Sequence, residues 1–454
     1  MNLRDKTTQL LDMIEQQGAK HADAIAVNSV GESIHVRHGK VESIEAEHAQ
    51  GIGLRGFVET QHGLAFASAS TSDLSEKGLQ TLAKQVVDMA NISEPDPDVV
   101  PPVNANHPSA HALQTWANQH PKTAHGWHSQ AAQDAALACE EAALYQQKDI
   151  QNSEGATAGF GDSHKVYAAS DGFIAENHKS SASLSVSVIA GQDEKMQRDY
   201  AWHSAFLARD LRDANSLGLE AANRASSRLG SKSISSRNCP VVFEPRIATS
   251  ILGHLISAIN GRAILQKRSF LLDAVGEKLF PDFIHLSEDP NHIDGMANRL
   301  FDGEGTICQA KNIIEAGKLT TFLTDRYAAK RLQHPATGNA SRGLTGDIGI
   351  GTANLILQAG SMSPQDIYHD IQDGFLVTEL MGFGINGVTG DYSRGAAGFL
   401  IENGRITQPV QGITIASNLK DMFNNISHVG NDLTWLGSTA TPSITISNMT
   451  IAGQ

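Results

Sequence analysis

A glycine-rich stretch set between two apolar segments constrains the fold of this chain more than any other feature. The sequence from Glu379 to Gly398 reads ELMGFGINGVTGDYSRGAAG, and apolar residues stand before it at 375–377 and after it at 399–401. Glycines occur at this density where the backbone needs a positive φ or approaches another segment closely. The pattern therefore predicts a buried strand, a glycine-rich loop and a second strand that returns beside the first.

Two known motifs can be tested against this stretch. Gly382, Gly384 and Gly387 match the GxGxxG pattern of dinucleotide-binding folds, which needs a helix directly after the glycines. Residues 388–395 show no helical apolar period and contain two more glycines. Residues 391–395 resemble the GxSxG nucleophile elbow, but Asp391 stands where the first glycine should be. We therefore reject both motifs.

Length, charge and cysteine content limit the class of protein. A chain of 454 residues is long enough for two or three domains with their own cores. The net charge of −14 and the lack of a basic cluster argue against nucleic-acid binding, which depends on Lys and Arg neutralising phosphates. Three widely spaced cysteines indicate a reducing compartment, and the polar N-terminus indicates neither a signal peptide nor a membrane span. We expect a cytoplasmic protein that binds neither nucleic acid nor a membrane.

The first part of the chain predicts short antiparallel strands after an N-terminal helix. The helix is expected at 3–17 because apolar residues recur on one of its faces. Gly31, His38-Gly39 and residues 61–63 should separate the strands that follow. Those strands are expected at 24–27, 33–37, 41–47, 51–58 and 64–69.

Composition changes predict four segments. Residues 1–92 form an N-terminal α+β subdomain, and residues 93–110 form a linker that holds five of the fourteen prolines. Residues 111–232 form a second α+β subdomain with helices at 123–147 and 215–228, and residues 233–454 form a mainly β domain. The predicted fold class is α+β, with an N-terminal meander region carrying two long helices and a C-terminal domain dominated by antiparallel sheet.

The C-terminal domain carries two clear local signals. An apolar helix is expected at 246–259, directly after a short strand at 240–243. Asn403-Gly404 separates apolar runs at 397–402 and 406–410, which is a strong signal for a type I′ hairpin.

Histidines offer no zinc motif. No His precedes a Glu, so the HExxH helix is absent. The pairs His107/His111 and His125/His128 have ligand-like spacing but no nearby third ligand, and we interpret them as solvated. His254 lies in an apolar helix and is expected to be a buried histidine with one hydrogen-bond partner, although a catalytic role stays open.

Polar side chains gather in the glycine-rich stretch, and two interpretations stay open. Asp391 and Arg394 could form an internal salt bridge that fixes the loop. Alternatively, they and the free backbone N–H groups could hold an extended peptide. Glu379 and Asn386 belong to the same set, together with Thr378 and Tyr392.

The combination of these motifs resembles the TldD/PmbA family of bacterial and archaeal proteins, also called modulators of gyrase. The similarity is strongest to the PmbA/TldE-type subunit and extends over nearly the whole chain, with 51–56 and 170–172 fitting more loosely. The stretches that carry it are 252–255, 268–271, 301–305, 337–340, 377–398, 401–404, 415–422 and 449–453.

The resemblance implies a cytoplasmic zinc metallopeptidase system, in which a TldD-type and a TldE-type subunit form a heterodimer that trims leader peptides and degrades unfolded polypeptides. It also implies that TldD-type members bind zinc through an HExxxH helix and a late cysteine. In this sequence the three ligand positions correspond to Gly253, Ala258 and Leu436, and His254 replaces the general base. None of the three can coordinate zinc, and a catalytic zinc needs three protein ligands.

We therefore expect a PmbA/TldE-like subunit that binds no cofactor and has no catalytic or metal-binding residue. Zinc is expected in a TldD-type partner subunit, the substrate is an extended peptide, and the chain alone could form a homodimer. The alternatives are a regulatory protein acting on gyrase or an RNA-binding regulator, and a self-sufficient hydrolase that uses Asp391, Ser393 or His254. The substrate-groove candidates are Glu379, Gly384, Asn386, Asp391, Arg394 and His254.

Overall fold

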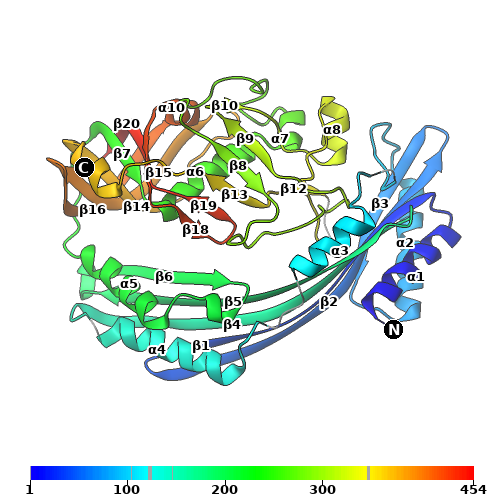
Figure 1. The fold of residues 1–454 in the computed structure, drawn as a ribbon, viewed down its shortest axis with the longest axis horizontal. Coiled ribbons are helices and arrows are strands. Elements are labelled where there is room, and N and C mark those ends of the chain that lie inside the picture. The colour runs from blue at the N-terminus through cyan, green and yellow to red at the C-terminus, as the bar shows by residue number, and fades with distance from the viewer. Residues whose placement is uncertain (1, 104, 121–124, 146, 345–347, 454) are drawn as a thin grey trace.

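The computed structural model describes residues 2–103, 105–120, 125–145, 147–344 and 348–453. A long, bent antiparallel sheet forms the N-terminal half, and a compact β-rich domain lies over its concave side (Figure 1). The α+β class predicted from the sequence is confirmed. None of the helices in the described ranges is both long and apolar enough to cross a membrane.

The N-terminal sheet has six antiparallel strands in the order β3-β2-β1-β4-β5-β6. Strands from both predicted subdomains thus join one sheet. The expected break at Gly31 is wrong, because this residue pairs with Gly161 and the strand runs on through it. The strands are β1 (His21–Arg37), β2 (Lys40–Thr60), β3 (Gly63–Thr71), β4 (Ile150–Ala169), β5 (Ile174–Ala190) and β6 (Gln197–Ala205).

Two helix pairs cover one face of this sheet. Ala24 packs under the first pair and Ile34 under the second, and both belong to the same face because side chains alternate along a strand. The other face, which includes Asp23 and Ile25, meets the C-terminal domain through Phe301. The first pair is α1 (Leu3–Gln16) and α2 (Glu76–Ile92), and the second is α4 (Ser129–Tyr145) and α5 (Ala214–Ser227).

The helix predictions for the N-terminal half hold with shifted ends. Helix α1 starts at a capping box formed by Asn2 and Asp5, which satisfies two backbone N–H groups. The helix expected at 123–147 begins at Ser129 within the described residues, and 121–124 and 146 lie outside them. Helix α3 (Ala110–Gln119) was missed, because none of its residues is buried and its apolar pattern is weak. Two short 3₁₀ helices, Asp193–Lys195 and Ala208–Asp210, flank β6.

The C-terminal domain packs two six-stranded sheets around helix α6 (Pro245–Ala258), with one core between them. One sheet has the order β16-β15-β14-β7-β20-β17, in which β7 and β14 run parallel. Its strands are β7 (Arg237–Phe243), β14 (Asp373–Met381), β15 (Asp391–Glu402), β16 (Arg405–Asn418), β17 (Ile426–Val429) and β20 (Ile444–Ala452). The predicted hairpin at Asn403-Gly404 is confirmed, with φ of 50° and 77° as a type I′ turn requires.

The second sheet of this domain has the order β10-β9-β8-β13-β19-β18. Its strands are β8 (Leu286–Asp289), β9 (Lys311–Glu315), β10 (Lys318–Leu319), β13 (Asn354–Leu357), β18 (Thr434–Leu436) and β19 (Thr439–Thr441). The remaining elements are short: α7 (Gly261–Leu265), α8 (Arg326–Leu332), β11 (Ala340–Ser341), β12 (Gly349–Ile350), α9 (Pro364–His369) and α10 (Leu419–Asn424).

Candidate functional site

Helix α6 lies at the centre of the candidate site. Pro245 occupies its first turn, where the missing N–H costs nothing, and the apolar residues Ile251, Leu252 and Leu255 are buried in the domain core. The helix packs against β7 and β14 on one side and against β18 and β19 on the other. His254 is half-buried on α6, and its ring meets the ring of Tyr392 edge-on, with 5.8 Å between centroids.

Five buried polar atoms at this place have no hydrogen-bond partner among the residues that the structure describes. They are His254 Nε2, Tyr392 Oη, Arg394 Nε and Thr378 Oγ1, and Arg246 Nε of the same helix is a fifth. Buried polar groups are nearly always paired, and an unpaired one costs about 1–3 kcal/mol. The expected partner of His254 is therefore missing, and donors and acceptors are left available to a bound group.

The titration of these side chains follows from their burial. Burial lowers the pKa of His254, and the positive charge of Arg394 lowers it further, so the imidazole is neutral near pH 7. Burial also raises the pKa of Tyr392 to about 12, against the opposing charge of Arg394. Arg394 is close enough to act on the phenol, but no donor–acceptor pair with hydrogen-bond geometry joins the two.

A cavity of about 250 Å³ opens beside α6, between the N-terminal and C-terminal halves. We call it the helix cavity. Its polar wall contains side chains from β6, from the C-cap of α5, and from α6, β14 and β15: Asp199, Arg228, Arg246, Thr378, Glu379 and Arg394.

Ion pairs across this cavity join the two halves of the chain. Asp199 is buried and faces three guanidinium groups, at 3.3 Å from Arg224, 3.5 Å from Arg228 and 2.9 Å from Arg246. Burial alone would raise the pKa of Asp199, but Arg224 and Arg246 hold it below its ordinary value. Arg228 also pairs with Glu379. Sequence reasoning missed this network because its members are far apart in the chain.

The glycine-rich loop folds on itself. The Asn386 side chain accepts hydrogen bonds from the backbone N–H groups of Val388 and Thr389, and the Asn386 N–H donates to the Asp391 carbonyl at 2.9 Å. Gly384 lies against β15, where a Cβ would stand 1.7 Å from the Ser393 carbonyl oxygen. This close approach explains why the loop needs glycine at that position.

The two interpretations of Asp391 and Arg394 can now be compared. The side chain of Asp391 accepts from Thr389 Oγ1 at 2.6 Å and contacts Asn418, while Arg394 lines the helix cavity. Three positions apart on one strand, the two residues project to opposite faces, so the internal salt bridge does not form. Ser393 is next to Tyr392 on β15 and projects to the opposite face, away from His254, so these two side chains do not form the Ser–His pair that a hydrolase uses.

The six groove candidates thus fall into two groups. Glu379 and Arg394 line the helix cavity, and His254 lies behind Arg394 against Tyr392. Gly384, Asn386 and Asp391 belong to the loop and shape it through backbone contacts. Their role in substrate binding stays a prediction.

The donor atoms around α6 do not fit a catalytic zinc. Gly253 and Ala258 offer no ligand atom, and Leu436 of β18, the strand that packs beside α6, offers none either. Within the described ranges, the one group of three or more metal-binding side chains close enough to share an ion lies in the N-terminal sheet. A single imidazole cannot hold a zinc ion that needs three protein ligands.

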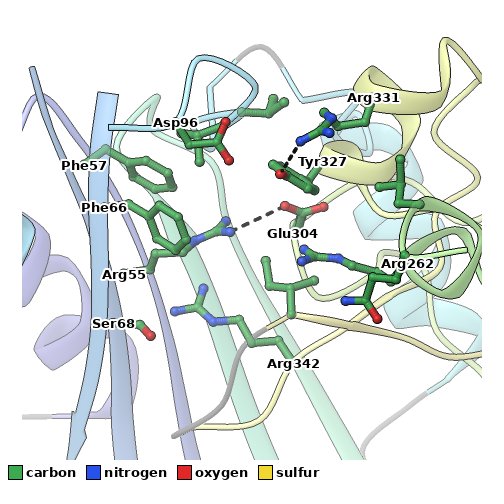
Figure 2. Close-up of a pocket in the computed structure, with 15 residues that line it drawn as sticks. Arg55, Phe57, Phe66, Ser68, Asp96, Arg262, Glu304, Tyr327, Arg331 and Arg342 are labelled. Atoms are coloured by element: carbon green, nitrogen blue, oxygen red, sulfur yellow. Dashed lines mark hydrogen bonds and ion pairs between the residues drawn. The ribbon is translucent and has the colours of Figure 1, made fainter. Parts of the chain in front are cut away.

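A second cavity, of about 370 Å³, lies where the N-terminal sheet meets the C-terminal domain (Figure 2). We call it the arginine cavity, because Arg55, Arg262, Arg331 and Arg342 line it together with Glu304 and Tyr327. In Figure 2 the guanidinium group of Arg55 points toward Glu304, and that of Arg331 points toward the Tyr327 hydroxyl.

Each guanidinium in the arginine cavity has a carboxylate partner. Arg55 and Arg342 share Asp23, Arg262 pairs with Asp325, and Arg331 pairs with Asp98. Burial, with the nearby charge of Asp302, raises the pKa of Glu304 to about 7, although Arg55 opposes the rise. This network of paired charges joins the two domains, whereas several of the buried polar atoms without a hydrogen-bond partner lie at α6.

Comparison with known proteins identifies the class. Three models of the PmbA/TldA metallopeptidase match the chain: domain 1 at residues 22–90, the central domain at 126–229 and the C-terminal domain at 236–453. Since these matches together cover more than half of the chain, it belongs to the PmbA/TldD metallopeptidase family.

Individual relatives agree with this assignment. The chain is 34% identical to the metalloprotease PmbA of Escherichia coli O157:H7, over 95% of this chain and 92% of that protein. It is 32% identical to a PmbA homolog of Haemophilus influenzae, over 100% and 96% of the two chains.

Solved structures agree at the level of the fold. A proposed modulator of DNA gyrase from Bacteroides thetaiotaomicron superposes with a TM-score of 0.87 at 26% identity, covering 99% of this chain and 98% of the other. TldE from Thermococcus kodakarensis superposes with a TM-score of 0.85 at 20% identity, covering 99% and 100%.

Proposed function

We propose that this chain is a PmbA/TldE-like subunit of a cytoplasmic peptidase that acts on unfolded or leader peptides. In this proposal a TldD-type partner supplies the zinc, the general base and the bond cleavage. The present chain completes the substrate cavity and positions an extended peptide. The observation that carries the proposal is the chemistry of α6: this helix holds two of the positions at which the resemblance implies zinc ligands, but Gly253, Ala258 and Leu436 provide none.

The unpaired polar atoms at α6 support a role in binding. An extended peptide presents one N–H and one C=O per residue, and these match the neutral imidazole of His254, the phenol of Tyr392 and the guanidinium of Arg394. Glu379 and Arg228 form the adjacent wall of the helix cavity. Backbone recognition of this kind tolerates many side chains, as the handling of unfolded polypeptides requires.

The test uses the purified chain alone and mixed with a TldD-type subunit. We expect the chain alone to hold no zinc at α6, so that His254→Gln leaves its zinc content unchanged, and we expect peptide hydrolysis to be absent. Mixing should yield a heterodimer on size-exclusion chromatography and hydrolysis of an unfolded peptide. Stoichiometric zinc at α6 with hydrolysis by the chain alone would contradict the proposal.

A matched pair of variants then tests the helix cavity in the mixed enzyme. Arg394→Ala should lower kcat/KM for the peptide about tenfold, the loss of one charge-assisted contact, without changing the zinc content. Arg405→Ala, which removes an exposed guanidinium in β16, should leave turnover unchanged. Equal kcat/KM values for the two variants would show that Arg394 takes no part in binding the peptide.

A regulatory protein is the second candidate, because a structural relative with 26% identity carries the description of a DNA gyrase modulator. The net charge of −14 favours a basic protein surface over the nucleic acid itself. Failure of the chain to form a complex or restore hydrolysis with a TldD-type subunit, combined with binding to gyrase, would favour this candidate.

A further inference from the structure

Two histidines and a glutamate form a cluster in the N-terminal sheet, away from α6. His164 of β4 pairs directly with His178 of β5, and the neighbouring pair joins Val166 to Glu176. Since side chains alternate, His164, His178 and Glu176 project from the same face, which is the face that Val166 presents to α1 and α2.

The donor atoms of this cluster are close enough to share one ion. The ligand atoms of the three side chains all lie within 4.8 Å of one another, and His164 Nε2 is 2.9 Å from Glu176 Oε2. The two imidazole rings stack with 4.0 Å between centroids. Ligand atoms around a tetrahedral zinc are about 3.4 Å apart, given bonds of about 2.0–2.2 Å, so small side-chain rotations would bring all three into range.

The surroundings hold the carboxylate in place. Arg4 of α1 binds the other carboxylate oxygen of Glu176, Oε1, at 2.8 Å, which leaves Oε2 directed at His164. Partners of this kind orient metal ligands from outside the coordination sphere. The positive charge of Arg4 opposes a bound cation, so we expect weaker affinity than that of a structural site with four ligands.

The cluster is also accessible. His164, Glu176 and His178 are each only partly buried. Water or a small ligand could therefore fill the remaining coordination positions. The strand pairing between β4 and β5 fixes the backbone of all three residues, so binding would order little further chain.

We propose that His164, Glu176 and His178 bind a divalent transition-metal ion. Two imidazoles and one carboxylate suit zinc, cobalt, nickel or copper, whereas magnesium and calcium prefer oxygen ligands. The ion would join β4 to β5 and, through Glu176 and Arg4, to α1. This site is independent of the α6 position and of the proposed peptidase role.

The test measures Zn²⁺ binding to the full chain after chelator treatment, by competition with a chromogenic zinc indicator. We expect one equivalent of Zn²⁺ to bind more tightly than any Zn²⁺ held weakly by the other histidines. His164→Gln and His178→Gln should each weaken this equivalent at least tenfold, since each removes one of three ligands. His62→Gln, in an exposed turn, and His254→Gln, at α6, are the matched controls and should retain it.

Two further measurements keep the result interpretable. Far-UV circular dichroism must show that the variants are folded, and Co²⁺ should produce visible d–d absorption in the wild type that is lost in His164→Gln. Zn²⁺ should raise the Tm of the wild type and of His62→Gln but not of His178→Gln. Equal zinc affinity and stoichiometry in the wild type and in both cluster variants would overturn the proposal, as would the absence of a distinct equivalent in the wild type.

Discussion

Asp23 of β1 and Arg342 of the C-terminal domain form a fully buried ion pair, with 2.6 Å between Oδ1 and Nη1. Asp23 also accepts from Arg55 of β2 at 2.7 Å and from the Tyr167 hydroxyl of β4 at 3.2 Å. One carboxylate thus joins three strands of the N-terminal sheet to the other domain, which fixes the position of the domain interface.

Asp23→Asn should destabilise the protein by about 3–5 kcal/mol. The substitution removes the charge but not the volume, and it leaves two buried guanidinium groups without their carboxylate. Urea denaturation followed by circular dichroism measures the change. Asp282→Asn, at an exposed pair with Lys278, is the control and should change stability by less than about 1 kcal/mol.

The same carboxylate predicts acid sensitivity. Burial alone would raise the pKa of Asp23, but Arg342 and Arg55 hold it below its ordinary value of 3.8. A carboxyl group whose pKa is lower in the folded than in the unfolded protein gives its full stabilisation at pH values above its pKa in the unfolded chain. This stabilisation is lost as the pH falls through its pKa in the folded protein. The stability gap between wild type and Asp23→Asn should therefore narrow below about pH 4. A gap that stays constant down to pH 2 would contradict this assignment.

Glu304 predicts that stability depends on pH in the opposite direction. Its pKa is raised to about 7 from 4.5, mainly by burial, so the folded state holds a proton that the unfolded state has released. Between these values the stability of the wild type should fall as the pH rises. Glu304→Gln mimics the protonated form, so its stability relative to the wild type should grow by up to about 3 kcal/mol from pH 4.5 to 7. Denaturation curves at several pH values measure this.

The exposed Glu315→Gln serves as the control for Glu304, and its stability should run parallel to that of the wild type across the same range. Parallel curves for Glu304→Gln as well would show that Glu304 is already ionised in the folded protein at pH 5.

Two glycines of the same loop should respond differently to alanine. At Gly384 a Cβ would meet the Ser393 carbonyl oxygen at 1.7 Å, whereas at Gly387 the nearest atom is 3.7 Å away. Gly384→Ala should break the 2.7 Å bond from the Ser393 N–H to the Gly384 carbonyl and lower the Tm by several degrees. Gly387→Ala should be close to neutral by differential scanning fluorimetry. Equal melting temperatures for both variants would mean that the loop rearranges freely.

The three cysteines should be unreactive in the folded protein. All are free and buried, and burial raises the pKa of Cys139 and Cys308 to about 12 and that of Cys239 to about 11. Because the thiolate is the nucleophile, a disulfide reagent at pH 8 should react with three thiols in denaturant but with almost none in the native state. Rapid labelling of one thiol without denaturant would reveal local opening around that residue.

Local sequence patterns correctly predicted those helices and strands that are set by residues close together in the chain. Alternation and turn residues gave the hairpin at Asn403-Gly404, and the apolar period gave α6. They failed at Gly31, because its neighbour Gly161 lies on another strand and continues the pairing. They also failed at α3, where no face of the helix is buried.

The sequence by itself determined the antiparallel α+β class, the glycine-rich loop and the lack of zinc ligands at Gly253, Ala258 and Leu436, because each depends on residue type or short-range pattern. Only the tertiary structure placed Arg394 in the helix cavity with Arg228 and Glu379, away from Asp391. It also brought His164 beside His178. These relationships arise from strand register and domain packing, which depend on contacts between residues far apart in the chain.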